Sequence, residues 1–331
     1  PERRGPHRLE RHRASVSGEA DARGPLRLSL PRSRAPSREA LAEAFAAKRP
    51  SWFSFAPAEA CADAWSIDAL ARRFGGEKVR IIVDAPNGSP WAEDASSHVR
   101  DATFAEYVSL LRDPGRTQHC YLALEPLARF PGLGPPAELV SMLGDRQADA
   151  RISVGSANVQ IGVHFDYEDN VFVQLSGTKR FTLIAPEYSR VMSASRFNMT
   201  QSEIDDASRP DLARFPRYAE ATVIEGEIGP GEALVIPRTW WHHFRSQADT
   251  ISLGFFMGRA SLRRDLAPIL RAYGVRYAVG VARQFVVHGL LGRPYRDGLY
   301  SHPPNGLVLY NDLKQRLGGR SVKTEGSFFE P

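Results

Sequence analysis

The sequence predicts a mainly β protein built on a double-sheet jelly roll, with α/β elements before this core and helices after it. Eight short segments of strand character lie close together between residues 151 and 256, and turn residues separate them. The chain has 24 prolines and 27 glycines among 331 residues, which suits short strands joined by turns. Hydrophobic residues make up 42% of the chain, enough for a substantial core.

The region before the core alternates between helical and extended patterns. Its expected helices are 38–47, 68–74, 103–112 and 136–143, and its expected strands are 78–83 and 120–124. We therefore assign residues 38–150 to an N-terminal α/β flank of the catalytic domain.

The core itself is assigned to residues 151–260. Its expected strands are 152–154, 160–166, 171–175, 181–184, 222–228, 233–236, 242–246 and 250–256. The turn Ser176-Gly177-Thr178 predicts a hairpin between the third and fourth of these strands. Residues 187–218 lack strand alternation and are expected to form an insert between the fourth and fifth of these strands.

The C-terminal region, residues 261–331, is expected to be helical. Apolar residues recur at helical spacing over 262–291, and a further helix is expected at 307–317, closed by Gly318. These helices either pack on the sheet or form the interface of a homodimer.

The positive charge of the chain belongs to its N-terminal end. The first 38 residues hold ten arginines and four acidic residues, a surplus of six against a net charge of +5 for the whole chain, so the remainder is near −1. Residues 1–37 are expected to form a basic, disordered tail. The four acidic residues and the absence of an amphipathic pattern argue against nucleic-acid binding or a presequence.

Two cysteines, Cys61 and Cys120, are too few for a disulfide framework or a zinc cluster. This predicts a reducing compartment and a cytoplasmic location. No apolar run approaches the roughly 18 to 20 residues of a membrane span, so no membrane partner is expected.

A metal site is predicted from His164-Phe165-Asp166 and from a second histidine in Trp240-Trp241-His242-His243. Alternate residues of a strand share a face, so His164 and Asp166 can bind one ion while Phe165 packs on the other side. Two imidazoles and one carboxylate leave half of an octahedral ion open, as in non-haem Fe(II) oxygenases.

Lys179 follows His164 by fifteen residues, on the same side of its strand as Phe181 and Leu183. An inward lysine is costly to bury unless it meets an anion, and the distal carboxylate of 2-oxoglutarate is such an anion. The alternative is that Lys179 caps an exposed turn.

These motifs resemble the cupin-type JmjC (cupin-8-like) family of Fe(II)/2-oxoglutarate-dependent oxygenases. The resemblance is strongest from about residue 155 to 257. It implies that His164, Asp166 and His242 are catalytic and bind iron, that Lys179 and Tyr121 bind 2-oxoglutarate, and that Asn170 lies close to this co-substrate. It also implies that His243 points to the opposite face.

The chain departs from the family pattern at three positions, one of which is Gly162, where a proline is usual. Ile161 stands where a co-substrate-binding threonine is usual, and Gly254 stands where an asparagine is expected. Gln160, Ser252 or Gln174 are candidates to compensate. Arg238 and Arg245 are candidates to meet a substrate carboxylate or to lie at the surface, and Trp240 and Trp241 are expected to serve packing.

The function implied by the resemblance is hydroxylation of an amino-acid side chain in a protein or peptide. Alternatives are hydroxylation of a small natural product or free amino acid, N-demethylation, and a non-catalytic metal-binding cupin. Expected partners are therefore a protein, peptide or small-molecule substrate and a second copy of the chain; nucleic acid and membrane are not expected.

Overall fold

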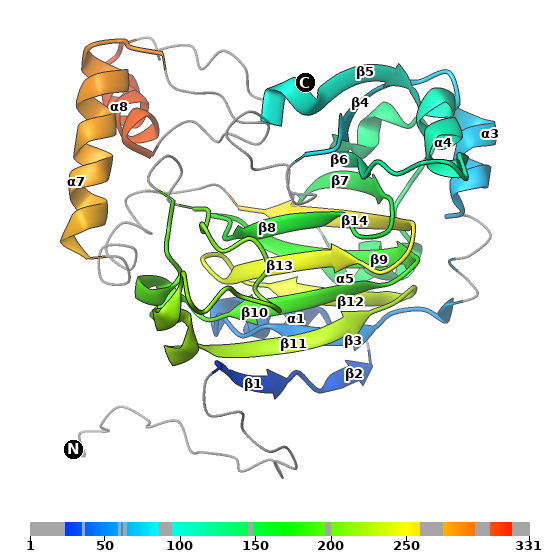
Figure 1. Cartoon of the computed structure of the whole chain (residues 1–331), viewed down its shortest axis with the longest axis horizontal. Helices are drawn as coiled ribbons and strands as arrows, with labels where there is room; N and C mark the ends of the chain where they lie inside the picture. Colours follow the sequence, from blue (N-terminus) through cyan, green and yellow to red (C-terminus); the bar gives the residue numbers. More distant parts are fainter. Residues whose placement is uncertain are drawn as a thin grey trace.

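The computed structural model describes residues 24–34, 37–58, 61, 65–85, 95–144, 148–195, 200–258, 274–294 and 305–319. Within these residues, two β-sheets face each other (Figure 1). The first sheet has five strands in the order β1-β11-β10-β13-β8. They are β1 (Leu26–Ser29), β11 (Thr222–Ile228), β10 (Lys179–Ile184), β13 (Trp241–Ser246) and β8 (Gln160–His164).

The second sheet has nine strands in the order β2-β3-β12-β9-β14-β7-β6-β4-β5. They are β2 (Arg32–Arg34), β3 (Ser51–Ser54), β12 (Glu232–Ile236), β9 (Asp169–Ser176), β14 (Thr250–Met257), β7 (Ala148–Gly155), β6 (Cys120–Pro126), β4 (Lys78–Val83) and β5 (Val99–Thr103). The predicted fold class, a jelly-roll core with α/β elements before it and helices after it, is confirmed.

Aromatic side chains fill the space between the two sheets. Phe172 of β9 stacks on Phe244 of β13 with ring centroids 4.2 Å apart, and Trp52 of β3 meets Phe181 of β10 edge to face at 5.4 Å. Each of these pairs joins one sheet to the other. The alternation of large apolar residues along the strands therefore produces a closed interior.

Helices cover the other face of the nine-stranded sheet. They are α1 (Arg38–Ala46), α3 (Ile67–Phe74), α4 (Phe104–Arg112) and α5 (Ala137–Leu143). Their buried residues share one apolar core with β7 and β14. Local sequence sets where they begin: the Ser66 hydroxyl accepts from the Ala69 amide at 3.1 Å, and Thr103 and Glu106 form a capping box.

The insert and the C-terminal helices lie on the outer side of the five-stranded sheet. The insert contains two 3₁₀ turns, Pro186–Val191 and Pro216–Glu220. After it come α7 (Val275–Gln284), a π-helical turn (Phe285–Leu290) and α8 (Asn305–Arg316). The first part of the helix expected at 262–291, residues 262–273, lies outside the described residues. In the part of the chain that is described, no helix has the length and apolar character needed to cross a membrane.

The prediction of a hairpin around Gly177 was wrong. β9 pairs with β12 and β14 in one sheet, whereas β10 pairs with β11 and β13 in the other. Gly177 has a φ of 67°, and a Cβ there would lie 2.2 Å from the Asp249 carbonyl oxygen, so a tight turn does exist. That turn carries the chain from one sheet to the opposite one.

The prediction of a disordered segment over 1–37 was wrong for residues 26–34; residues 1–23 and 35–36 lie outside the described part. β1 pairs in parallel with β11, and β2 pairs in parallel with β3. Arg27 forms an ion pair with Glu225 at 2.5 Å, and Leu30 between the two strands packs into the interior cluster. These polar strands are held by backbone pairing, which their composition does not reveal.

Candidate metal centre and co-substrate site

Three potential metal ligands converge at one end of the space between the sheets. The donor atoms of His164, Asp166 and His242 all lie within 4.8 Å of one another. Asp166 faces both histidines, with Oδ1 3.9 Å from His164 Nε2 and Oδ2 3.5 Å from His242 Nε2. The arrangement brings together the set of donors that a 2-His-1-carboxylate centre requires.

Backbone carbonyl groups fix the orientation of both imidazoles. His164 Nδ1 lies 2.8 Å from the Gly162 carbonyl oxygen, and His242 Nδ1 lies 3.0 Å from the Trp240 carbonyl oxygen. A carbonyl only accepts, so each Nδ1 carries a proton and each Nε2 faces the centre. Burial, with the neighbouring His242, lowers the pKa of His164 to about 3, which keeps this ring neutral at physiological pH.

A bulge in β8 turns His164 inward. His242 pairs with His164 and Phe244 pairs with Ile161, so two steps along β13 match three steps along β8. Ile161 faces the interior opposite Phe244, and simple alternation would then direct His164 outward. The extra residue in β8 reverses the alternation, so that Val163 packs outside with Trp241 while His164 faces His242.

Asp166 lies beyond the strand on which it was predicted. β8 ends at His164, because the amide of Phe165 donates to the Thr200 carbonyl of the insert rather than to β13. The Asp166 carbonyl accepts a 2.8 Å hydrogen bond from the Thr239 amide. Asp166 is therefore brought to the centre by a loop that is tied to the turn before His242.

An ion pair joins the same two ligand-bearing segments. Arg238 Nη2 lies 2.9 Å from Asp169 Oδ2, and the Arg238 amide donates to Asp169 Oδ1 at 2.9 Å. Both side chains are largely buried. Asp169 is three residues after Asp166, and Arg238 is four residues before His242. The ion pair therefore connects the segments that carry these two ligands, and the sequence did not predict this connection.

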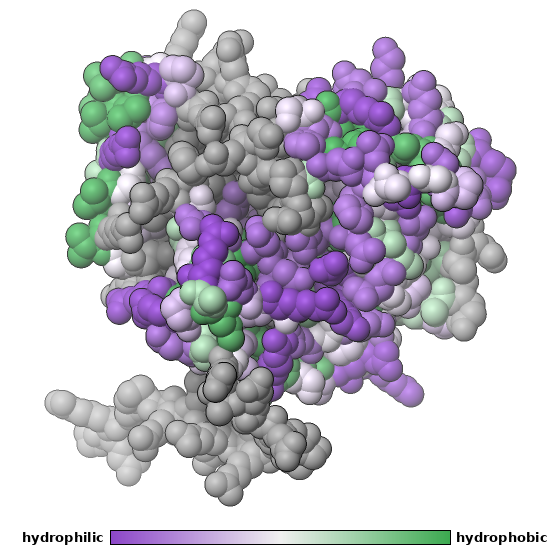
Figure 2. Space-filling model, viewed as in Figure 1, coloured by the Kyte–Doolittle hydropathy of each residue, from purple (hydrophilic) through white to green (hydrophobic). Residues whose placement is uncertain are grey.

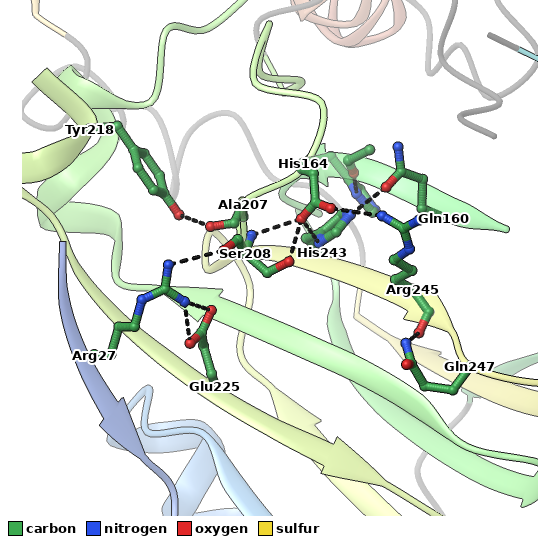
Figure 3. Close-up of polar contacts among 12 residues, drawn as sticks. Arg27, Gln160, His164, Ala207, Ser208, Tyr218, Glu225, His243, Arg245 and Gln247 are labelled. Atoms are coloured by element: carbon green, nitrogen blue, oxygen red, sulfur yellow. Dashed lines mark hydrogen bonds and ion pairs between the residues drawn. The ribbon is translucent and has the colours of Figure 1, made fainter. Parts of the chain in front are cut away.

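His243 points to the outer face of the five-stranded sheet, and Figure 3 shows it beside Gln160 and Arg245. Its Nε2 lies 3.3 Å from Gln160 Oε1, and its Nδ1 lies 3.8 Å from Asp206 Oδ1 of the insert. Arg245 also binds Asp206, at 3.0 Å. Burial lowers the pKa of His243 to about 4, so this ring is a neutral packing group between sheet and insert.

Lys179 is buried between the sheets, and its ammonium nitrogen lies 3.2 Å from Ser252 Oγ. The rings of Tyr121 and Phe172 lie within 5.7 Å of this nitrogen. No carboxylate among the described residues forms an ion pair with it, and burial lowers its pKa to about 7. A buried lysine without an acidic partner is a ready site for an anion.

Tyr121 and Asn170 lie on the inner face of the opposite sheet. Burial raises the pKa of Tyr121 to about 12, with an opposing hydrogen bond from Ser153, so the phenol is a neutral donor. Asn170 Oδ1 is buried and has no hydrogen-bond partner among the described residues. Both side chains thus offer polar atoms to a ligand between the sheets.

The structure shows which side chains surround Gly254 and Ile161, two positions at which the chain departs from the family pattern. A Cβ on Gly254 would lie 2.8 Å from the Phe256 ring and 3.6 Å from Asn170 Oδ1, so Phe256 occupies the space of a side chain here. Ile161 packs near Tyr121. Of the suggested compensating groups, Ser252 contacts Lys179, whereas Gln160 faces the outside and Gln174 donates to the Ser176 carbonyl.

The paired tryptophans serve packing. Trp241 is fully buried on the outer side and donates to Ser189 Oγ at 2.9 Å, and Trp240 donates to the Lys48 carbonyl at 3.0 Å. Neither arginine singled out in the sequence is free, since Arg238 pairs with Asp169 and Arg245 with Asp206.

Comparison with known proteins agrees with this geometry. A family model described as the cupin-like domain matches residues 37–258, more than half of the chain. Relatives include mouse tRNA wybutosine-synthesizing protein 5, which is 24% identical over 253 residues, 70% of this chain and 78% of the mouse protein. The human protein of that name is 29% identical over 103 residues, 31% of this chain and 32% of the relative.

A second group of relatives carries a different name. Human HSPB1-associated protein 1 is 30% identical over 107 residues, which are 31% of this chain and 22% of that protein. The chain belongs to the cupin-like domain family of JmjC type, and it is an Fe(II)- and 2-oxoglutarate-dependent oxygenase.

Proposed function

We propose that His164, Asp166 and His242 bind Fe(II), and that Lys179, Tyr121 and Asn170 hold 2-oxoglutarate. The observation that carries this proposal is the buried ammonium of Lys179, which lies on the same inner face of the five-stranded sheet as His242, since Leu183 pairs with His242 and Lys179 is four residues away. A cupin that only binds metal has no need of a buried lysine without an acidic partner. The five-carbon chain of a keto diacid suits a site with a metal at one end and a cation at the other.

The bound iron and 2-oxoglutarate supply the oxidation: dioxygen gives one atom to succinate, formed with release of carbon dioxide, and the other to a C–H bond of the substrate. The protein holds the reactants in place and keeps water away. The carbonyls of Gly162 and Trp240 set the imidazole planes, and the rings of Phe172 and Tyr121 surround the Lys179 ammonium. Low polarity around this ammonium strengthens its attraction to a carboxylate.

The proposed substrate is a residue within a macromolecule. An amino-acid side chain in a protein or peptide is the first candidate, as the resemblance to protein hydroxylases implies. The second candidate is a base in tRNA, because relatives named for wybutosine synthesis align over as much as 70% of the chain. N-demethylation would use the same oxidation on an N-methyl carbon and would release formaldehyde.

The test of this function begins with the co-substrate. Purified protein loaded with Fe(II) is expected to convert 2-oxoglutarate to succinate, and Asp166→Ala protein is expected not to. Absence of succinate under all loading conditions would favour a non-catalytic cupin. Mass spectrometry of peptide libraries and of digested tRNA, each searched for the gain of one oxygen atom or the loss of a methyl group, then separates the substrate candidates.

We also propose a homodimer formed through the C-terminal helices. Val275, Val279, Val286 and Leu290 are between 44% and 80% exposed, and Figure 2 shows hydrophobic surface along the outer side of this region. Tyr277 and Val281 of the same helix are buried against the core, so α7 is apolar on both sides. Light scattering of the wild-type protein and of Val279→Arg is the test, and a monomeric wild type would overturn the proposal.

A cytoplasmic location remains a proposal. Cys61 and Cys120 are both free and buried, which fits a reducing compartment.

A further inference from the structure

The residues that flank the candidate ligands form a single outward-facing cluster. Phe165 and Tyr167 stand on either side of Asp166, and Trp241 precedes His242. Phe165 contacts Tyr167 edge to face at 5.4 Å and Trp241 at 4.9 Å. The two ligand-bearing segments are therefore in contact on the side away from the metal, through aromatic rings.

Helix α7 closes this cluster. Tyr277 is fully buried, Val281 is 4% exposed, and both pack with Phe165, Tyr167 and Trp241. The hydroxyl groups of Tyr167 and Tyr277 are 2.8 Å apart and form a hydrogen bond. Because both hydroxyls are buried, this bond fixes where the Tyr167 ring lies.

Tyr167 is the residue next to Asp166, so its side chain and the carboxylate share one short stretch of backbone. That stretch is held at the Asp166 carbonyl by the Thr239 amide and at the Tyr167 ring by Tyr277. The hydrogen bond from the Thr239 amide to the Asp166 carbonyl does not restrict rotation about the backbone bonds of Tyr167. The contact between Tyr167 and Tyr277 does restrict it. If the Tyr167 ring were free to move, the backbone that it shares with Asp166 would move too, and the position of the Asp166 carboxylate would change.

We infer that Tyr277 is a positioning residue for the metal centre, acting through the Tyr167 hydroxyl, and that α7 is part of the catalytic unit. The inference rests on the proposed iron site. It extends that site beyond the residues matched by the family, which end at 258, whereas α7 begins at Val275. The Tyr277 hydroxyl touches no reacting group; it acts on the direction of the Asp166 carboxylate.

A matched pair of substitutions separates positioning from stability. Tyr277→Phe removes the hydroxyl and keeps the ring. Tyr107→Phe is the control, because Tyr107 is also fully buried and its hydroxyl donates to the Val154 carbonyl at 2.6 Å, in the core behind the nine-stranded sheet. Tyr107→Phe removes two hydrogen bonds of a buried hydroxyl, because the Leu122 amide also donates to it at 3.3 Å. A decrease in the urea midpoint of unfolding is expected for both variants, and the decrease for Tyr107→Phe should be at least as large as that for Tyr277→Phe.

Co²⁺ titration of the apo protein, followed by its visible absorption, is the deciding measurement. Tyr277→Phe and Tyr167→Phe are each expected to weaken Co²⁺ binding about fivefold, the equivalent of one hydrogen bond. The double variant is expected to lose less than the sum of the two single losses, because both substitutions remove the same Tyr167–Tyr277 bond. Tyr107→Phe is expected to bind Co²⁺ as the wild type does.

The outcomes that overturn the inference are distinct. Unchanged Co²⁺ affinity in both Tyr277→Phe and Tyr167→Phe, with wild-type protein that binds Co²⁺, leaves the proposed iron site standing and removes the role of α7. An equal loss in Tyr107→Phe assigns the effect to general stability and also overturns it. A wild-type protein that binds no Co²⁺ or Fe²⁺ overturns the proposed metal site and this inference together. If Tyr277→Phe does not fold, Tyr167→Phe supplies the same test from the other partner.

Discussion

The ammonium group of Lys179 on β10 and the hydroxyl group of Ser252 on β14 form a hydrogen bond of 3.2 Å that spans the two sheets. A hydroxyl group solvates a cation but does not neutralise it. Burial accordingly lowers the pKa of Lys179 to about 7.

Lys179→Ala is expected to raise the 2-oxoglutarate concentration needed for half saturation by at least about tenfold, because a buried carboxylate left without its cation loses on the order of 2–5 kcal/mol. Lys179→Arg should restore part of this loss, since a planar fork fits a site shaped for a point charge poorly. Anaerobic titration of iron-loaded protein measures both. Arg180→Ala is the control, because Arg180 is on the same strand but pairs with Glu227 at the surface. Equal affinity in Lys179→Ala and wild type would show that this lysine has no part in co-substrate binding.

The affinity for 2-oxoglutarate is expected to fall as the pH rises above about 7. Below the pKa of about 7, Lys179 is already protonated in the free protein, and the anion binds without proton uptake. Above it, binding must also protonate the lysine, so the dissociation constant should rise by up to about tenfold per pH unit. Titrations at several pH values test this. Lys179→Arg should show a flat profile, and a flat profile in the wild type would contradict the prediction.

Lys179→Met is expected to stabilise the protein while it removes 2-oxoglutarate binding. The folded-state pKa of Lys179 is lowered from 10.5 to about 7, so its unfavourable contribution is complete below pH 7 and disappears as the pH rises from 7 to 10.5. Replacing the buried cation with an apolar side chain should increase the free energy of unfolding by about 1–4 kcal/mol near neutral pH. Urea unfolding at two pH values measures it, and the gain should shrink at the higher pH. A Met variant less stable than the wild type would mean that the buried charge of Lys179 does not destabilise the folded protein.

His164→Ala, Asp166→Ala and His242→Ala are each expected to abolish iron binding and succinate formation while the fold is retained. His243→Ala should be much milder on metal binding, because His243 contacts Gln160 and Asp206 on the outer face. Metal content after anaerobic loading, together with circular dichroism, gives the comparison. A stronger loss in His243→Ala than in His242→Ala would show that the ligand was assigned to the wrong histidine.

Breaking the Arg238–Asp169 ion pair is expected to affect both stability and metal binding. Asp169→Ala removes the ion-pair partner of the buried Arg238 guanidinium, which should cost about 3–5 kcal/mol of unfolding free energy. It also frees the segments that carry Asp166 and His242, so metal affinity should fall by about tenfold or more. Arg27→Gln is the control, since its ion pair with Glu225 is half exposed and lies away from the centre. Unchanged metal affinity in folded Asp169→Ala protein would limit the pair to a structural role.

Short apolar runs separated by turn residues were sufficient to predict the strands of the core, most of which are buried on both faces. They could not predict which strands pair. Gly177 gives the same local turn signal in a hairpin and in a connection between sheets, and only contacts with distant strands decide between the two. β1 and β2 were missed for a related reason: they pair through backbone groups, which every sequence has.

The candidate site was also predicted only in part: the sequence indicated its residues, but not the contacts that bring them together. The motif with His164 and Asp166 was recognised, but the argument that both lie on one regular strand was incorrect, since a bulge and a loop place them together. Tyr121 and Asn170 were reached through resemblance alone. The contacts of Arg238 with Asp169 and of Tyr167 with Tyr277 join residues 69 and 110 positions apart, and no local pattern predicts such pairs.

The strands β1 and β2 have a practical consequence for anyone who shortens this chain to its recognisable domain. The family match begins at residue 37, just after them. A chain started there would leave the outer edge of β11 in one sheet and of β3 in the other without partners, since β1 and β2 cover those two edges. Open edges of this kind recruit strands from neighbouring molecules, so the trimmed protein is expected to aggregate even though it keeps all of the proposed iron and co-substrate ligands.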